Sequence, residues 1–180
     1  MKSWLLEGSS QMPIYTDMRL VFDSLSGKQL EFNWLITDIQ YAKGDIEWRP
    51  ASGTRPPNIE VSNESSYPTD ALDKQIAFIT GHELNEIIYG NDIQFIWAVF
   101  SGIKKEFEID VNDLSVEPYA DGNPNFWIPE PQIQHPLAEI EIVCWDSTST
   151  LFLSKDNEIG QKFKNYFTDA KDLKEYNQQI

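Results

Sequence analysis

Cys144 is the only cysteine in the 180-residue chain, and its side chain has the most reactive chemistry in the sequence. A cysteine nucleophile needs a neighbouring base that takes the thiol proton, and the only two histidines, His82 and His135, are the candidates. Cys144 also stands in phase with Ile140 and Ile142 along an alternating segment, and free cysteine is among the most buried residue types. We therefore expect Cys144 to pack in a core rather than to react.

Other partial motifs lack a residue that their chemistry requires. The run from His82 to Glu86 begins like a zinc-protease helix, but Glu86 stands where the second histidine is needed. Ser147 lacks the flanking glycines of a nucleophile elbow, so a turn formed with Asp146 is the expected role. We expect no metal and no cofactor. A glycosidase-like pair cannot be selected among 29 acidic residues, so a hydrolase or transferase with a hidden carboxylate site remains an alternative.

The hydrophobic pattern predicts a single α+β domain over residues 1–180, with a mainly antiparallel sheet and about three helices packed on it. Strands are expected at 30–41, 45–48, 75–79, 93–100, 105–111, 140–145 and 151–153. Helices are expected at 14–25, at 81–90 after a Thr80 cap, after an Asp156 cap, and as a further turn or helix at 170–176. Long loops are expected at about 50–71 and 117–137.

Two of these strands carry more specific expectations. The run 93–100 is apolar throughout, which predicts a central strand buried on both faces. The segment 105–111 alternates charge with Phe107, Ile109 and Val111, which predicts an antiparallel neighbour of that strand with one wet face. Ser101 and Gly102 between them suggest a bend or a bulge.

The chain is strongly acidic, with 14 basic and 29 acidic residues and a net charge of −15. Such a charge repels nucleic acid phosphates and anionic lipid surfaces and attracts basic partners, so we expect neither direct nucleic-acid binding nor membrane binding. The apolar run near the amino terminus is too short for a signal peptide or a membrane span, and one cysteine allows no internal disulfide. A cytoplasmic location is the simplest expectation.

The sequence offers two groups of residues for binding a partner. Tryptophan and tyrosine side chains often anchor interfaces, and several lie in or beside the two long loops, although they can equally hold those loops down on the domain. The acidic candidates are Glu83, Glu86, Asp92, Glu106, Glu108, Asp110 and Asp113. The aromatic candidates are Trp48, Tyr67, Tyr119, Phe126 and Trp127.

The carboxy-terminal run IEIVCWDSTSTLFLSKDNEIGQKFKNYFTDAKDLKEYN, residues 140–177, resembles the end of small bacterial proteins that accompany polymorphic toxins. The whole chain is similar in size and acidity to immunity proteins of contact-dependent growth inhibition systems. The resemblance implies an inhibitor that binds a cognate toxin with a basic surface, often a nuclease, and occludes its active site. It assigns no binding residue, because the matching segment looks structural. An acidic adaptor protein is a further alternative.

Overall fold

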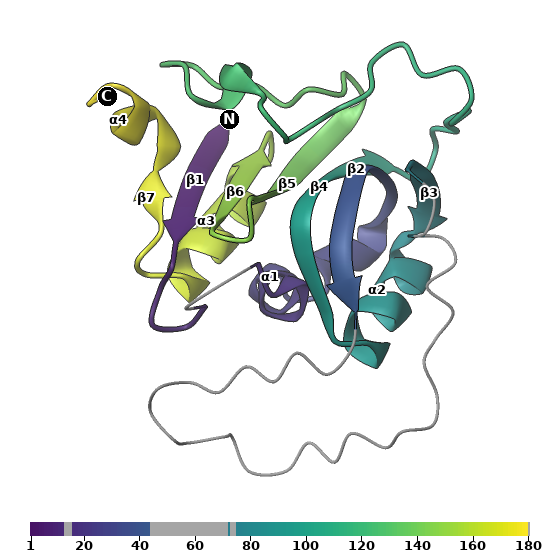
Figure 1. Cartoon of the computed structure of the whole chain (residues 1–180), viewed down its shortest axis with the longest axis horizontal. Coiled ribbons are helices and arrows are strands. Elements are labelled where there is room, and N and C mark those ends of the chain that lie inside the picture. The colour runs from purple at the N-terminus through teal and green to yellow at the C-terminus, as the bar shows by residue number, and fades with distance from the viewer. Residues whose placement is uncertain (13–15, 44–71, 73–74, 180) are drawn as a thin grey trace.

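The computed structural model describes residues 1–12, 16–43, 72 and 75–179, and these residues form the expected α+β fold (Figure 1). Their strands make one seven-stranded sheet in the order β3-β2-β4-β5-β6-β1-β7, and every neighbouring pair is antiparallel. The strands are β1 (Lys2–Glu7), β2 (Phe32–Lys43), β3 (Ala77–Thr80), β4 (Ile93–Lys104), β5 (Ala138–Trp145), β6 (Ser149–Ser154) and β7 (Lys171–Asp172). The helices are α1 (Met18–Leu25), α2 (Gly81–Gly90), α3 (Asn157–Tyr166) and α4 (Leu173–Asn177), with 3-10 turns η1 (Lys28–Glu31) and η2 (Pro124–Phe126).

Side-chain caps fix where the helices begin. Asp17 caps α1 and Asp156 caps α3, each accepting backbone N–H bonds from the first turn. Thr80 and Glu83 form a reciprocal capping box at α2, as the sequence predicts. The first helix starts at Met18 rather than near residue 14, because the Asp17 cap sets its first turn.

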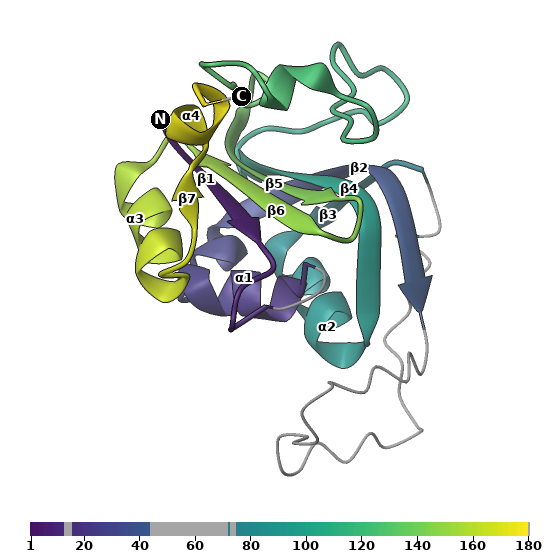
Figure 2. The same cartoon turned by 60° about the vertical axis from the view of Figure 1, so that its left-hand side comes forward.

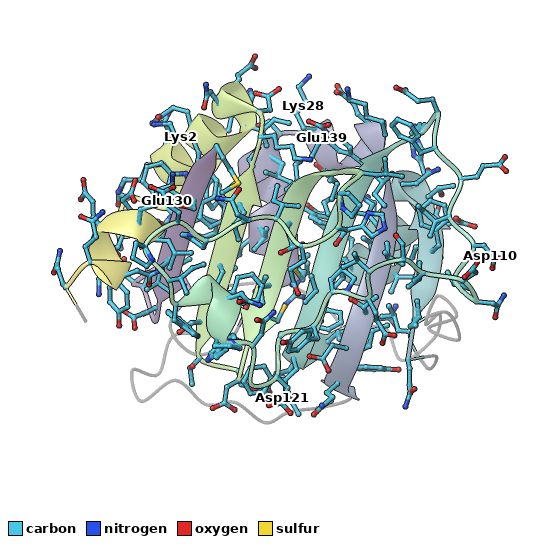
Figure 3. All side chains as sticks on the ribbon, turned by 90° about the horizontal axis from the view of Figure 1, so that it is seen from above. Lys2, Lys28, Asp110, Asp121, Glu130 and Glu139 are labelled. Atoms are coloured by element: carbon cyan, nitrogen blue, oxygen red, sulfur yellow. The ribbon has the colours of Figure 1, made fainter. Side chains whose placement is uncertain are left out.

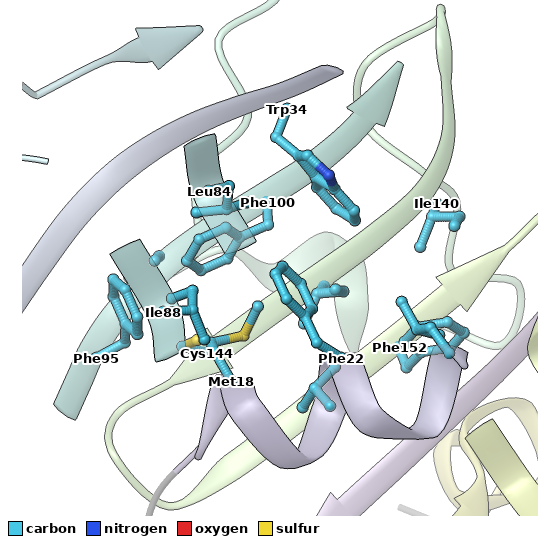
Figure 4. Packing of buried hydrophobic residues seen from close by; sticks show 14 of the residues in the cluster. Met18, Phe22, Trp34, Leu84, Ile88, Phe95, Phe100, Ile140, Cys144 and Phe152 are labelled. Atoms are coloured by element: carbon cyan, nitrogen blue, oxygen red, sulfur yellow. The ribbon is translucent and has the colours of Figure 1, made fainter. Parts of the chain in front are cut away.

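The main core lies between the sheet and three helices. Figure 2 shows α1, α2 and α3 together beneath the sheet, and Figure 4 shows Phe22 of α1 and Leu84 and Ile88 of α2 facing side chains of the strands. Trp34 and Phe100 come from β2 and β4 and are fully buried there. Burial of this apolar surface is the main stabilising contribution to the fold.

A long connection covers the other face of the sheet. Residues 105–137, here called the strap, link β4 to β5 and run over the strands on the side away from α1–α3 (Figure 2). Beneath the strap lie two smaller apolar clusters, one around Val99 and Val143 and one around Leu35 and Ile103. The sheet is therefore buried on both faces, although only one face carries α1–α3.

The predicted central strand at 93–100 is confirmed, and the predicted neighbouring strand at 105–111 is wrong. β4 is central, between β2 and β5, and continues through Ser101 to Lys104, with a register shift against β5 after Gly102. Residues 105–111 form no strand, because both ladders of β4 are already taken by β2 and β5. Their alternation arises because Ile109 and Val111 pack on the sheet face while the strap runs over it.

One further difference from the sequence prediction concerns β1. β1 was not expected, because its buried SWLL run is continuous rather than alternating, which gives no period-2 signal. It lies between β6 and β7, and so it is buried inside the sheet. The predicted strand 45–48 and the predicted loop 50–71 lie outside the described residues.

Candidate functional site: the acidic strap

The first half of the strap is the most acidic surface segment among the described residues. Between residues 106 and 121 the sequence has six carboxylates and no lysine or arginine, and all six acidic residues are exposed. They are Glu106, Glu108, Asp110, Asp113, Glu117 and Asp121. Figure 3 looks down on this face and shows Asp110 and Asp121 at its outer edge. Like charges concentrated on one segment produce a local negative potential that attracts a basic partner.

The strap also exposes apolar side chains next to these acids. Phe107 is 38% exposed, Val116 38%, Tyr119 44% and Ile128 41%. Over the rest of the described chain, only Met1 and Tyr89 are large apolar side chains with comparable exposure. Carboxylates and exposed aromatic side chains therefore lie on the same segment, as in interfaces with central anchors and a charged rim.

Hydrogen bonds from β2 hold the middle of the strap. Asp38 Oδ2 accepts from the backbone N–H groups of Ala120 and Asp121, both at 2.8 Å. Thr37 Oγ1 donates to the carbonyl oxygen of Pro118 at 2.6 Å. Asp38 has a φ of +52°, at the register irregularity between β2 and β4, and this places its carboxylate toward the strap. Tyr119 is thus presented from a fixed backbone.

A buried carboxylate on β5 holds the end of the strap. Glu141 has no exposed surface, and its Oε2 accepts from the backbone N–H of Gln134 at 3.0 Å. Gln134 Oε1 in turn accepts from the Tyr119 N–H at 3.1 Å and from Asn123 Nδ2 at 2.9 Å. Burial raises the pKa of the Glu141 carboxyl to about 7, although the Gln134 hydrogen bonds act in the opposite direction.

The second half of the strap is held by α4 and by aromatic contacts. Asn177 Nδ2 donates to the carbonyl oxygens of Phe126 at 2.8 Å and of Ile128 at 2.6 Å. The Trp127 ring lies 5.0 Å from that of Trp145. Phe126 is fully buried, so it is a packing residue and not a surface anchor, and Trp127 is half-buried. For Phe126 the alternative that loop aromatics hold the loop down is correct.

The structure divides the predicted acidic residues between two faces. Glu106, Glu108, Asp110 and Asp113 lie on the strap, together with the aromatic candidate Tyr119. Glu83, Glu86 and Asp92 lie on or just after α2, in the helical layer on the opposite side of the sheet.

The acids of the helical layer differ in their surroundings. Glu83 Oε2 accepts hydrogen bonds from Thr80 in the capping box, and these bonds lower the Glu83 pKa. Asp92 lies 3.4 Å from the Arg19 guanidinium. Trp48 and Tyr67 lie outside the described residues.

Cys144 belongs to the helix-side core, as expected. It is fully buried in the cluster that Figure 4 shows, beside Met18, and burial raises its pKa to about 12. A thiol with that pKa remains protonated at neutral pH and is a weak nucleophile. His82 is exposed on α2, and His135 is buried in the strap across the sheet.

No described pocket gathers the predicted residues. An open hollow of about 600 Å³ lies beside β1, β7 and α4, and its lining includes Trp4, Lys171 and Tyr176. Lys171 there already donates to Glu7 at 2.7 Å. Among the described ranges, no group of three or more His, Cys, Asp or Glu residues is arranged to hold a metal ion. Nor does any helix within them have the length and apolarity needed to cross a bilayer.

The sequence reasoning missed the residues that hold the strap in place. Glu141 alternates with apolar neighbours and therefore has the pattern of a solvent-facing residue. No neighbouring residue in the sequence reveals that the strap covers it. Phe107 was expected to face inward and is exposed.

No protein-family model, curated protein or solved structure matches the chain.

Proposed function

We propose that this chain is an immunity protein that binds a cognate toxin with a basic, nuclease-type active site and neutralises it by occlusion. The observation that carries the proposal is strap segment 106–121, where six exposed carboxylates and no lysine or arginine flank exposed Phe107, Val116 and Tyr119. The resemblance of residues 140–177 to proteins that accompany polymorphic toxins supports the same function. The protein would act in the cytoplasm of the producing cell, where the toxin must be inhibited.

The two kinds of side chain have different parts in this mechanism. A nuclease active site is basic because it holds a phosphate backbone, so the strap carboxylates would occupy the positions of phosphates. Long-range attraction raises the association rate by about tenfold to a thousandfold at low salt. The exposed aromatic side chains would slow dissociation once they are desolvated against the toxin.

A fixed strap favours tight binding. Thr37 and Asp38 of β2 hold the backbone on either side of Tyr119, at Pro118 and Ala120, before any partner arrives. Less conformational entropy is then lost when the complex forms than with a free loop. The contacts to Asp38 and Glu141 therefore contribute to affinity without touching the partner.

The first experiment is co-purification of the chain with the product of the adjacent gene, followed by association rates over a salt series. We expect a stable complex whose association rate falls as salt rises. Absence of a complex, or an association rate that salt does not change, contradicts the proposal.

Matched variants then locate the surface. Glu106→Gln with Glu108→Gln removes two strap charges, whereas Glu86→Gln with Glu158→Gln removes two charges from the helical layer. Both pairs change the net charge equally, so a difference reports the position of the charges. We expect the first pair to slow association several-fold more than the second, because its charges lie on the proposed interface.

A second matched pair tests the anchors. Tyr119→Ala should accelerate dissociation by about tenfold or more, and Tyr89→Ala, at the same 44% exposure on α2, should not. Equal dissociation rates for Tyr119→Ala and Tyr89→Ala would mean that the interface does not lie on the strap.

A further inference from the structure

Glu141 is the buried acid at the centre of the sheet, and its hydrogen bonds all go to the strap. Its Oε2 accepts from the Gln134 N–H at 3.0 Å, and its Oε1 lies 3.4 Å from Gln134 Nε2. Through Gln134 the same carboxylate is connected to Tyr119 and Asn123. One acidic group therefore links the start and the end of the segment 119–134.

We propose that Glu141 is a pH-dependent latch: the strap stays closed on the sheet while the carboxyl is neutral, and opens more often as it ionises. The inference rests on the strap contacts alone and stands whether or not the strap binds a toxin.

The buried site suits the neutral acid better than the charged one. A carboxylate without exposed surface has lost its hydration, and burial is the first cause of its raised pKa, about 7 against an ordinary 4.5. Ser101, the register partner of Glu141 on β4, is uncharged and offers no cation to offset a buried carboxylate. A charged Glu141 regains hydration when the strap opens.

The other charged groups around Glu141 have smaller or opposite effects. Lys155, after β6, donates from Nζ to the Pro136 carbonyl oxygen at 3.1 Å, and its charge lowers the Glu141 pKa. The pKa of His135 is lowered, first by burial and then by the charge of Lys155. Protonation of His135 therefore favours opening of the strap as pH falls, opposite to the effect of Glu141. Glu139, also on β5, lies 4.0 Å from Lys104. The remaining register partner of Glu141, Leu153 of β6, is uncharged.

The experiment is amide hydrogen exchange of the whole chain between pH 6 and pH 8, corrected for the intrinsic pH dependence of exchange. The reporters are the N–H groups of Ala120, Asp121 and Gln134, which bond to carboxylates of β2 and β5 only while the strap is closed. With a closed pKa near 7 and an open pKa near 4.5, the opening equilibrium constant should rise about tenfold over this range.

Variants assign the effect to one residue. Glu141→Gln should remove the rise, while His135 remains in both proteins and cancels from the comparison. The matched control Glu139→Gln, on the same strand, should keep the wild-type profile. Parallel profiles for the wild type and Glu141→Gln would overturn the proposal.

Two further measurements keep the test decisive if Glu141→Gln does not fold. Gln134→Ala retains the acid and should raise opening at every pH, with a rise between pH 6 and pH 8 at least as large as in the wild type, because its side-chain bond lowers the Glu141 pKa. Carbon-13 NMR of the glutamate carboxyls in the wild type should show one group titrating near pH 7 together with strap exchange. If every glutamate titrates near its ordinary pKa, the latch does not exist.

Discussion

Asp38 and Ala120 join the sheet to the strap: the carboxylate Oδ2 accepts the Ala120 N–H at 2.8 Å, although the two residues belong to segments far apart in the sequence. Ala120 is fully buried, so its N–H has no access to water if the carboxylate is removed. The neighbouring Asp121 N–H shares the same oxygen but lies in an exposed residue. This contact fixes the strap beside Tyr119.

Asp38→Ala should therefore lower the free energy of unfolding by about 2 kcal/mol, which urea denaturation measures. Asp38→Asn keeps an acceptor oxygen and should lose clearly less. Equal losses for the two variants would mean that the hydrogen bonds contribute little.

Glu141→Gln should stabilise the protein at alkaline pH. The pKa of this acid is raised in the folded state, so ionisation penalises folding progressively as pH rises from about 4.5 to about 7. Above pH 7 the penalty is complete and is about 3 kcal/mol at most. Urea denaturation at pH 4 and pH 8 should show little difference between variant and wild type at pH 4 and a more stable variant at pH 8. A variant less stable than the wild type at pH 8 would contradict this sign.

Gly81→Ala should be among the most damaging small substitutions. A Cβ at residue 81 would lie 2.5 Å from the Gln29 carbonyl oxygen and 2.7 Å from that of Phe32, and neither backbone atom can move without shifting η1 or β2. We expect a loss of about 3 kcal/mol or more in urea denaturation. Gly122→Ala is the control, because nothing lies within 4 Å there and only its φ of +68° opposes the change, at about 1 kcal/mol.

Thr80→Ala should cost about 1 kcal/mol, because the Thr80 hydroxyl caps α2 at the Glu83 N–H. The Glu83 pKa is lowered by hydrogen bonds from the Thr80 backbone and then its side chain, so this acid stabilises the fold above its ordinary pKa of 4.5. That contribution is lost as pH falls through the folded value. Glu83→Gln should therefore be less stable than the wild type at pH 7, and the difference should shrink below pH 4. A difference that does not depend on pH would assign it to packing.

Cys144 should not react with thiol reagents at pH 8 in the folded protein. Its thiol is fully buried and its pKa is raised to about 12. The reagent therefore cannot reach the sulfur, and almost no reactive thiolate is present at pH 8. Reaction should become rapid in denaturant, and its native rate should follow global unfolding. Fast stoichiometric labelling of the folded chain would show that the thiol is accessible.

Local patterns predicted most of the helix-side architecture, because its signals are local. The caps at Thr80 and Asp156 and the alternation of Ile140, Ile142 and Cys144 each require only neighbouring residues. The strap-side face could not be predicted in the same way. Whether Glu141 faces water depends on the path of the strap over the sheet, and no periodicity in the sequence predicts that path.

The acidic surface was predicted in part. Glu106 to Asp113 could be selected because they follow one another in the sequence. The sequence could not separate them from Glu86, because charge counting does not tell which face of a sheet a residue occupies. Phe126 and Tyr119 illustrate the same difficulty for aromatic residues: they stand in one loop, yet the first is buried and the second exposed.

The position of β1 has a consequence during synthesis. Lys2 pairs with Ser154 and Trp4 with Asp172, so β1 has no ladder until β6 and β7, far later in the sequence, have been synthesised. Its apolar Trp4, Leu5 and Leu6 stay unpaired during that interval, a situation in which chaperones are expected to bind nascent chains. Insertion of β1 into the sheet is thus a late step of folding.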